Sequence, residues 1–297
     1  MSGMTMCEPT ELYNILQQGT TAYPCLSDPN YLLLLDARKE HEYNESHIIT
    51  SKKAPRTENE EFLVPYDAEL ECKTHVVVID NSTRSLAESG PAIDCAQVMS
   101  EMGSKNPVKI LRGGYEDFSA LYPFLRTQKI IYMPRELDDL KTYPIEVLPG
   151  QVYLGDYEQS CSAVVQKDLK IKARVNVTLQ NDELGSAEQC DTLQLAVTDD
   201  NEADLSVHFQ SACQFIESHS KKGKVVLVYS ELGISRSVTI VVAYLMYFYK
   251  WSLEDAYRHV EDCKPTIRPN RAFIEQLSQW EKEIHEETLT DISDPNY

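Results

Sequence analysis

The sequence of 297 residues predicts an α/β protein of two domains, each with a sheet flanked by helices. In the first half of the chain, short apolar runs alternate with amphipathic stretches, which is typical of a parallel sheet covered by helices, and the second half resumes apolar runs that indicate a second α/β domain. Residues 130–143 interrupt this alternation with Pro134 and an acidic cluster. The length also suits two domains of ordinary size, each able to bury a core of its own.

The strands of each domain are predicted from the apolar runs, taken in chain order. In the first half these runs are Tyr31–Leu35, Val76–Ile79 and Val108–Leu111. In the second half they are Gln151–Gly155, Val175–Val177, Leu193–Val197 and Val225–Tyr229, followed by helical patterns from Ser237 onward. We therefore predict a first domain at 1–130, a linker at 131–143, a second domain at 144–285 and an acidic C-terminal tail at 286–297.

Composition excludes several classes of partner and site. The chain has 28 Lys and Arg against 47 Asp and Glu, a net charge of -19, which repels nucleic acid and anionic membrane surfaces. Its longest apolar run, Val238–Met246, is far shorter than the ~20 residues that span a bilayer. The eight Cys lack metal-ligand spacing, which predicts reduced thiols in an intracellular, most simply cytoplasmic, protein with no metal and no cofactor.

The segment from Lys224 to Ser237 is the most informative in the sequence. An apolar strand leads into a short loop, and the loop leads directly into an apolar helical run. Such a loop directs backbone amides and a helix N-terminus at one point, and Arg236 can clamp an anion there. We predict a phosphate-binding loop formed by Ser230, Glu231, Leu232, Gly233, Ile234, Ser235 and Arg236. The plainer interpretation is an ordinary strand-turn-helix with Arg236 in a salt bridge.

This loop resembles the signature of the cysteine-dependent phosphatases, His-Cys-x5-Arg-Ser, in its dual-specificity form. Gly233, Ser235, Arg236 and Ser237 match, whereas Tyr229 replaces the His and Ser230 replaces the nucleophilic Cys. A thiol in such a loop ionises near neutral pH, but a hydroxyl stays protonated without a base beside it. The resemblance therefore implies an inactive site.

The resemblance covers residues 144–285 and implies roles for further residues. Asn270 would support the phosphate loop, and Asp199 would stand at the general acid, although Asp200 beside it leaves this assignment open. An acidic loop that caps a helix is the interpretation we favour for Asp199, since no leaving group needs a proton. Glu231 would repel a phosphate dianion unless its side chain points outward.

The first domain, over residues 8–127, resembles the rhodaneses. Leu35–Arg38, Glu42-Tyr43, His47-Ile48 and Arg112–Gly114 match patterns of that family. Active members carry a Cys after the central strand, and Asp80 occupies this position here. A carboxylate cannot carry a transferable sulfur, so we expect no sulfurtransferase activity and interpret Asp80 as part of a polar loop.

A rhodanese-like domain before a dual-specificity domain is the layout of the MAP kinase phosphatases, which dock kinases through paired Arg residues. The nearest basic group here is Lys52, Lys53 and Arg56, for which solvated side chains are the plainer interpretation. The two altered sites together resemble the serine/threonine/tyrosine-interacting-like protein 1 family, pseudophosphatases with a rhodanese-like front domain.

We therefore expect a pseudophosphatase that regulates signalling by binding proteins, namely phosphoproteins, kinases or active phosphatases. Two alternatives remain open. One is a weak phosphatase that uses Ser230 or another thiol, and the other is a structural scaffold whose pocket is vestigial.

Overall fold

A computed structural model describes residues 3–20, 23–131, 134–180 and 190–293. The chain forms two compact units, Met1–Thr142 and Tyr143–Tyr297. Each unit has a sheet with helices, as the sequence predicts, and each of these sheets has five strands, where three and four apolar runs marked the expected ones. The segment predicted as a linker contains a short helix, α5 (Pro134–Asp138), and Glu136 of this helix pairs with Lys129 at 2.9 Å.

The first unit is built on a parallel sheet with the strand order β1-β8-β7-β4-β6. Its strands are β1 (Met4–Cys7), β4 (Leu32–Asp36), β6 (Lys52–Lys53), β7 (His75–Ile79) and β8 (Val108–Leu111). Smaller pairs are β2 (Gly19–Thr20) with β3 (Tyr23–Pro24), and β5 (His47–Ile48) with β9 (Arg126–Thr127). The central strands β4 and β7 are apolar at nearly every position because both of their faces are covered.

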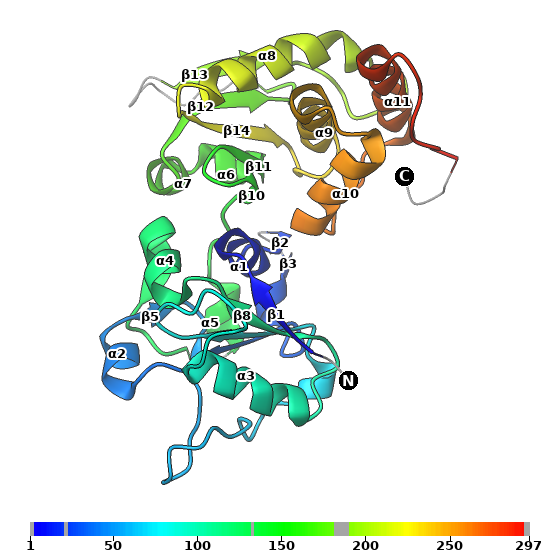
Figure 1. The fold of residues 1–297 in the computed structure, drawn as a ribbon. Coiled ribbons are helices and arrows are strands. Elements are labelled where there is room, and N and C mark those ends of the chain that lie inside the picture. The colour runs from blue at the N-terminus through cyan, green and yellow to red at the C-terminus, as the bar shows by residue number, and fades with distance from the viewer. Residues whose placement is uncertain (1–2, 21–22, 132–133, 181–189, 294–297) are drawn as a thin grey trace. The chain divides into compact units, whose positions relative to one another are not determined.

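Helices lie on both faces of this sheet (Figure 1). Val76 and Val78 face α3 (Pro91–Glu101), which contributes Cys95 and Met99 to the same buried cluster. The alternation of a strand turns Val77 to the opposite face, where α1 (Pro9–Leu16) and α4 (Gly114–Leu121) lie. A shorter helix, α2 (Glu40–Glu45), follows β4, and the 3₁₀ turns are Cys25–Ser27, Leu70–Cys72 and Pro123–Leu125.

The second unit has the strand order β10-β11-β14-β12-β13. The hairpin of β10 (Ile145–Leu148) and β11 (Val152–Asp156) is antiparallel, and the remaining pairs are parallel. The other strands are β12 (Ile171–Asn176), β13 (Asp191–Gln194) and β14 (Val225–Ser230). As the central strand, β14 ends where the neighbouring parallel strands also end, which is the edge where α/β proteins place their sites.

The helices of the second unit bury a continuous core against this sheet. Figure 1 shows α8 (Phe209–Ser220) and α7 (Ala163–Asp168) on opposite faces, with α6 (Tyr157–Cys161) beside α7. The run Val238–Met246 lies inside α9 (Arg236–Tyr249) and is fully buried. Two further helices, α10 (Leu253–Cys263) and α11 (Arg271–His285), complete the unit, with a 3₁₀ turn at Ser206–His208. Within the described residues, no helix combines the length and apolarity that crossing a membrane requires.

Part of the segment predicted as an acidic tail packs against the second unit. Glu281 of α11 is fully buried and accepts hydrogen bonds from the amides of Leu289 and Thr290, at 2.9 and 3.0 Å. The same carboxylate accepts from the amide of Leu253 at the start of α10, at 2.6 Å. One buried carboxylate therefore fixes the chain beyond α11 to the beginning of α10.

Candidate functional site

The loop between β14 and α9 has a backbone conformation that requires glycine at one position. Gly233 has a φ of 66°, in the left-handed region. A Cβ atom on Gly233 would lie 2.6 Å from the carbonyl oxygen of Gly155 in β11. The match of Gly233 to the phosphatase signature therefore reflects a close approach of two backbones.

Neighbouring segments hold the loop through its carbonyl groups. The carbonyl of Ile234 accepts from the amide of Arg268 at 2.7 Å, and that of Gly233 accepts from Nζ of Lys264 at 3.0 Å. The carbonyl of Glu231 accepts from the amide of Tyr157 at 3.4 Å. In the part of the chain that the structure describes, the amides of residues 232–234 donate to no protein atom. A loop whose carbonyl groups are bonded to neighbouring segments, and whose amides have no acceptor in the protein, is arranged to bind an anion.

Arg236 lies at the start of α9 with its side chain 9% exposed. Its Nη1 donates to the carbonyl oxygen of Val197 at 2.9 Å, and its Nε lies 3.4 Å from Oδ2 of Asp199. Its Nη2 pairs with the carboxylate of Glu231. Arg236 thus binds two carboxylates of its own chain. Glu231 therefore does not point outward: its carboxylate lies against Arg236, where it would repel a phosphate dianion.

Ser230, which the sequence analysis aligns with the nucleophile of the phosphatases, is 2% exposed. Its Oγ lies 2.9 Å from Oγ of Ser237, so the hydrogen-bond partner of the hydroxyl is another hydroxyl. Tyr229 before it is fully buried in β14. Neither Ser237 nor Arg236 is a base that could take the Ser230 proton, so this contact does not activate the hydroxyl.

Asp199 and Asn270 close the other side of the loop. Oδ1 of Asp199 accepts from Oγ of Ser235 at 2.8 Å and from Nδ2 of Asn270 at 3.0 Å. Asn270 is also the N-cap of α11, because its Oδ1 accepts from the amide of Phe273 at 3.0 Å. The side chain of Asp200 points to a different partner, because its Oδ1 accepts a hydrogen bond from the amide of Glu202 at 2.9 Å. Asp199, and not Asp200, is therefore the carboxylate that contacts the loop.

The sequence analysis did not place Lys264 in the site. Its side chain reaches the Gly233 carbonyl from the segment after α10, and the residue is 8% exposed. Burial lowers the pKa of Lys264 to about 8, although the nearby Asp156 opposes this shift. No local signal in the sequence marks a lysine that will reach a loop 31 positions earlier in the chain.

Asp80 closes the corresponding loop of the first unit. It follows β7, and its carboxylate accepts from the amides of Ser82 and Thr83 at 3.1 and 2.9 Å and from Oγ1 of Thr83 at 2.6 Å. The amide of Ala92, at the start of α3, lies 3.4 Å away. The amides of this loop and of the start of α3 favour a negative charge, and the carboxylate of Asp80 provides it in place of an external anion.

Comparisons with known proteins agree with both halves of this description. Residues 152–283 match the family of the dual specificity phosphatase catalytic domain, and residues 8–121 match the rhodanese-like domain. Dual specificity protein phosphatase 1 of Homo sapiens is 30% identical over 294 residues, which covers 85% of this chain and 78% of that protein. This chain belongs to the dual-specificity protein phosphatases. The predicted order of a rhodanese-like and a dual-specificity phosphatase-like domain is confirmed.

Some relatives of this dual-specificity phosphatase family member match about half of the chain. Dual specificity protein phosphatase Mpk3 of Drosophila melanogaster is 41% identical over 143 residues, which is 48% of this chain and 34% of that protein. The chain spans between 34% and 62% of the length of the first curated relatives that it matches. The crystal structure of human tyrosine phosphatase-like serine/threonine/tyrosine-interacting protein is similar at 26% identity, with a TM-score of 0.43, over 46% of this chain and 95% of that one.

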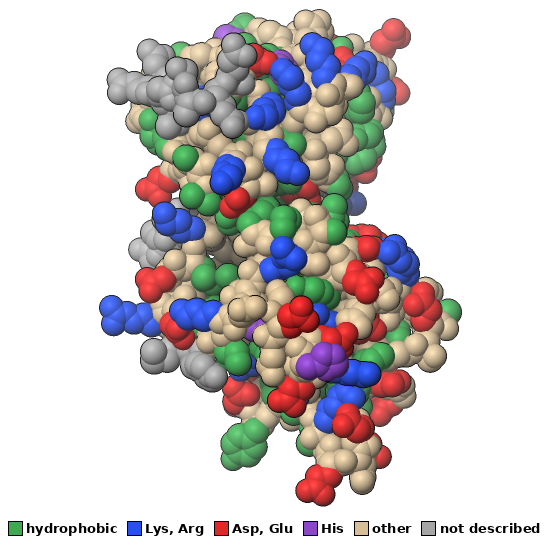
Figure 2. Space-filling view, turned by 90° about the vertical axis from the view of Figure 1, so that its left-hand side faces the viewer, with side chains coloured by type: hydrophobic (Ala, Val, Ile, Leu, Met, Phe, Trp, Pro, Cys, Tyr) green, Lys and Arg blue, Asp and Glu red, His purple; other side chains and the backbone are tan. Residues whose placement is uncertain are grey.

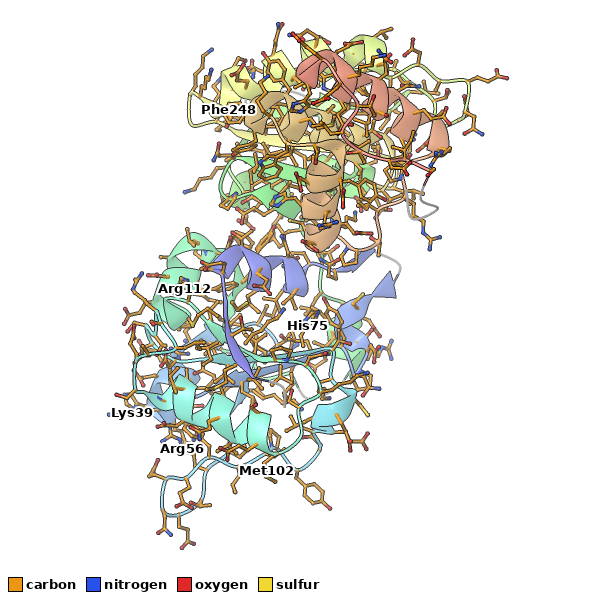
Figure 3. All side chains as sticks on the ribbon, turned by 45° about the vertical axis from the view of Figure 1, so that its right-hand side comes forward. Lys39, Arg56, His75, Met102, Arg112 and Phe248 are labelled. Carbon is orange, nitrogen blue, oxygen red and sulfur yellow. The ribbon has the colours of Figure 1, made fainter. Side chains whose placement is uncertain are left out.

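The basic group considered for kinase docking in this dual-specificity phosphatase family member is paired with carboxylates. Lys52 lies 3.0 Å from Asp67, Lys53 lies 2.8 Å from Glu40, and Arg56 lies 2.9 Å from Glu60. Arg56 also covers the ring of Phe62 and is labelled in Figure 3 on the same side of the first unit as Lys39. Figure 2 shows acidic and basic side chains intermingled on one face of this unit. These pairs leave kinase docking as a prediction without structural support.

Proposed function

We propose that this dual-specificity phosphatase family member is catalytically inactive and regulates signalling by binding phosphoproteins, kinases or active phosphatases. The observation that carries the proposal is the contact between Ser230 and Ser237, 2.9 Å apart, at the position of the family nucleophile. Phosphoryl transfer by this family requires a thiolate, whereas the hydroxyl of Ser230 remains protonated beside Ser237. Loss of the nucleophile in comparable enzymes reduces turnover on the order of a million-fold.

Two thiols in the later part of the second unit, Cys213 and Cys263, do not supply a substitute. Burial raises the pKa of Cys263 to about 12, and burial also raises the pKa of Cys213 well above its usual range. Both thiols are therefore protonated at neutral pH and are poor nucleophiles. This argues against the alternative of a weak phosphatase that uses another cysteine.

The contacts that hold the loop in shape favour a pocket that still binds a ligand over a vestigial one. Lys264, Arg268 and Asn270 still hold the carbonyls and side chains of the loop as a strand-loop-helix cradle. A scaffold with a vestigial pocket is the second candidate, and the pairing of Glu231 with Arg236 favours it.

Inactivity is tested by hydrolysis of para-nitrophenyl phosphate and of a phosphotyrosine peptide by the wild type and by Ser230→Ala. We expect no turnover above the buffer rate from either protein. Vanadate-sensitive turnover by the wild type that disappears in Ser230→Ala would overturn the proposal.

Binding is tested by retention of phosphotyrosine peptides on the immobilised full chain. We expect wild type to retain phosphorylated over unphosphorylated peptide, and Arg236→Ala to lose this difference. Equal retention by wild type and Arg236→Ala would assign the interface to another surface and favour the vestigial pocket.

A further inference from the structure

Glu231 pairs with Arg236 on the side of the guanidinium group that no backbone carbonyl holds. Nη1 of Arg236 donates to the Val197 carbonyl, Nη2 pairs with Glu231, and Nε lies 3.4 Å from Asp199 without a hydrogen-bond partner among the described residues. An arginine that binds phosphate donates hydrogen bonds from one or two of its guanidinium nitrogens to the phosphate oxygens. A bound phosphate group and the Glu231 carboxylate would therefore compete for the same atom.

The two carboxylates around Arg236 differ in how firmly they are fixed. Asp199 accepts hydrogen bonds from Ser235 and Asn270 in addition to facing Arg236. Glu231 has Arg236 as its side-chain partner, and its side chain is 36% exposed against 9% for Arg236. Glu231 can consequently turn into solvent while Asp199 and Arg236 stay in place.

We propose that Glu231 is an internal competitor of phosphate and selects the phosphorylated partner that this loop accepts. The inference rests on the proposed binding function, because it concerns the regulation of the same loop. A phosphate dianion that enters must displace Glu231 from Arg236, and until it does so the carboxylate repels it. The displaced carboxylate then lies beside the bound phosphate, next to the exposed Leu232, without its arginine.

This arrangement defines the chemistry of the preferred partner. A Lys or Arg side chain next to the phosphorylated residue would pair with the displaced Glu231 and replace the contact that Arg236 gives up. A partner without such a cation would leave Glu231 unpaired beside the phosphate. The loop is therefore specific for a phosphorylated residue with a basic neighbour, and the net charge of -19 of the chain favours the same partners.

The first test measures the dissociation constant of inorganic phosphate for the full chain by isothermal titration calorimetry. Glu231→Gln, which keeps the size of the side chain and removes its charge, should bind phosphate at least about tenfold more tightly than wild type. Glu283→Gln removes an exposed charge at the far end of α11 and should bind as wild type does. In the Glu231→Gln background, Arg236→Ala should abolish the gain, which assigns the gain to this loop.

The second test compares two phosphotyrosine peptides that differ only in Lys or Ala next to the phosphotyrosine. Wild type should prefer the Lys peptide by about tenfold, and Glu231→Gln should lose most of that preference. Unchanged phosphate affinity in Glu231→Gln, or an equal preference for Lys in both proteins, would overturn the inference. Wild-type hydrolysis would instead overturn the proposed inactivity, so the two failures are distinguishable. Superimposable unfolding curves of the two proteins show that the variant is folded.

Discussion

Nδ2 of Asn270 donates a hydrogen bond to Oδ1 of Asp199 at 3.0 Å, across 71 positions of the chain. Because Asn270 is also the N-cap of α11, one side chain connects the start of the last helix to the carboxylate that faces Arg236. The loop of residues 230–236 is thus held by a residue that belongs to neither the loop nor its flanking elements.

This double role predicts a graded effect of substitution at Asn270. Asn270→Ser keeps an N-cap acceptor and loses the contact with Asp199, so it should cost about 1 kcal/mol in the free energy of unfolding. Asn270→Ala loses both and should cost about 2 kcal/mol. Trp251 and Trp280 both lie in the second unit, so urea unfolding followed by Trp fluorescence reports this unit alone. Equal losses in both variants would show that the N-cap contributes nothing, and an Asn270→Ser variant as stable as wild type would show the same of the contact with Asp199.

Gly233→Ala should destabilise the second unit more than backbone strain alone explains. Gly223 supplies a matched control, because it also has a positive φ, 68°, but has no atom within 4 Å of an added Cβ. Gly223→Ala should cost about 1 kcal/mol for the left-handed conformation, and Gly233→Ala about 3 kcal/mol or more, because its Cβ meets the Gly155 carbonyl. Urea unfolding of both variants gives the comparison. A Gly233→Ala loss no larger than that of Gly223→Ala would contradict the close approach.

The buried Glu281 predicts an acid-dependent contribution to stability. Burial alone would raise the pKa of Glu281, but the hydrogen bonds from Leu253, Thr290 and Leu289 outweigh it and lower the pKa below 4.5. Since the unfolded chain takes up the proton first, the stabilisation is complete above about pH 4.5 and is lost as the pH falls towards the folded pKa.

The measurement is the difference in free energy of unfolding between wild type and Glu281→Gln, from urea curves followed by Trp fluorescence. At pH 7 the difference should be about 2 kcal/mol or more in favour of wild type, because Gln cannot accept all of these hydrogen bonds. It should shrink as the pH is lowered from about 4.5 towards the folded pKa. A difference that is constant over this range would be inconsistent with the lowered pKa.

In the first unit, Asp80→Ala should loosen the segment between β7 and α3. It leaves the amides of Ser82 and Thr83 without their carboxylate acceptor, at a cost of about 2 kcal/mol. Cys95 in α3 is fully buried, so its labelling by a thiol reagent reports the opening of this region. Labelling of Cys95, followed by mass spectrometry, should be at least about tenfold faster in Asp80→Ala, with Asp80→Asn in between. An unchanged rate would show that Asp80 does not stabilise this region.

The sequence predicted those features that depend on local pattern. The apolar runs became β4, β7 and β8 in one unit and β11, β12 and β14 in the other, because a strand covered on both faces is apolar throughout. The loop from Ser230 to Arg236 was found through its spacing between a strand and a helix. Its Gly233 matches the phosphatase signature, and the positive φ of this residue is a conformation that favours a residue without a Cβ.

Features that depend on distant segments meeting were not predictable from pattern. Lys264 looks like an ordinary exposed lysine in sequence, and only the return of the chain after α10 brings it to Gly233. Glu281 likewise appears as one of several acidic residues of an amphipathic helix, yet it is the acceptor that holds residues 289 and 290. The sequence indicated that Glu231 lies beside the loop, but the direction of its side chain, towards Arg236, required coordinates.

The proposed inactivity attributes the lack of turnover to the side chains at positions 229 and 230 of a phosphatase scaffold that is otherwise retained. Its most direct test is the kcat/KM for para-nitrophenyl phosphate of the full-length double variant Tyr229→His with Ser230→Cys, beside wild type and the single variant Tyr229→His. Our account predicts vanadate-sensitive turnover in the double variant and none in the other two, with a further gain when Glu231→Gln is added, since the chain already supplies Arg236 and a supported loop. A folded double variant with no more turnover than wild type would contradict this prediction.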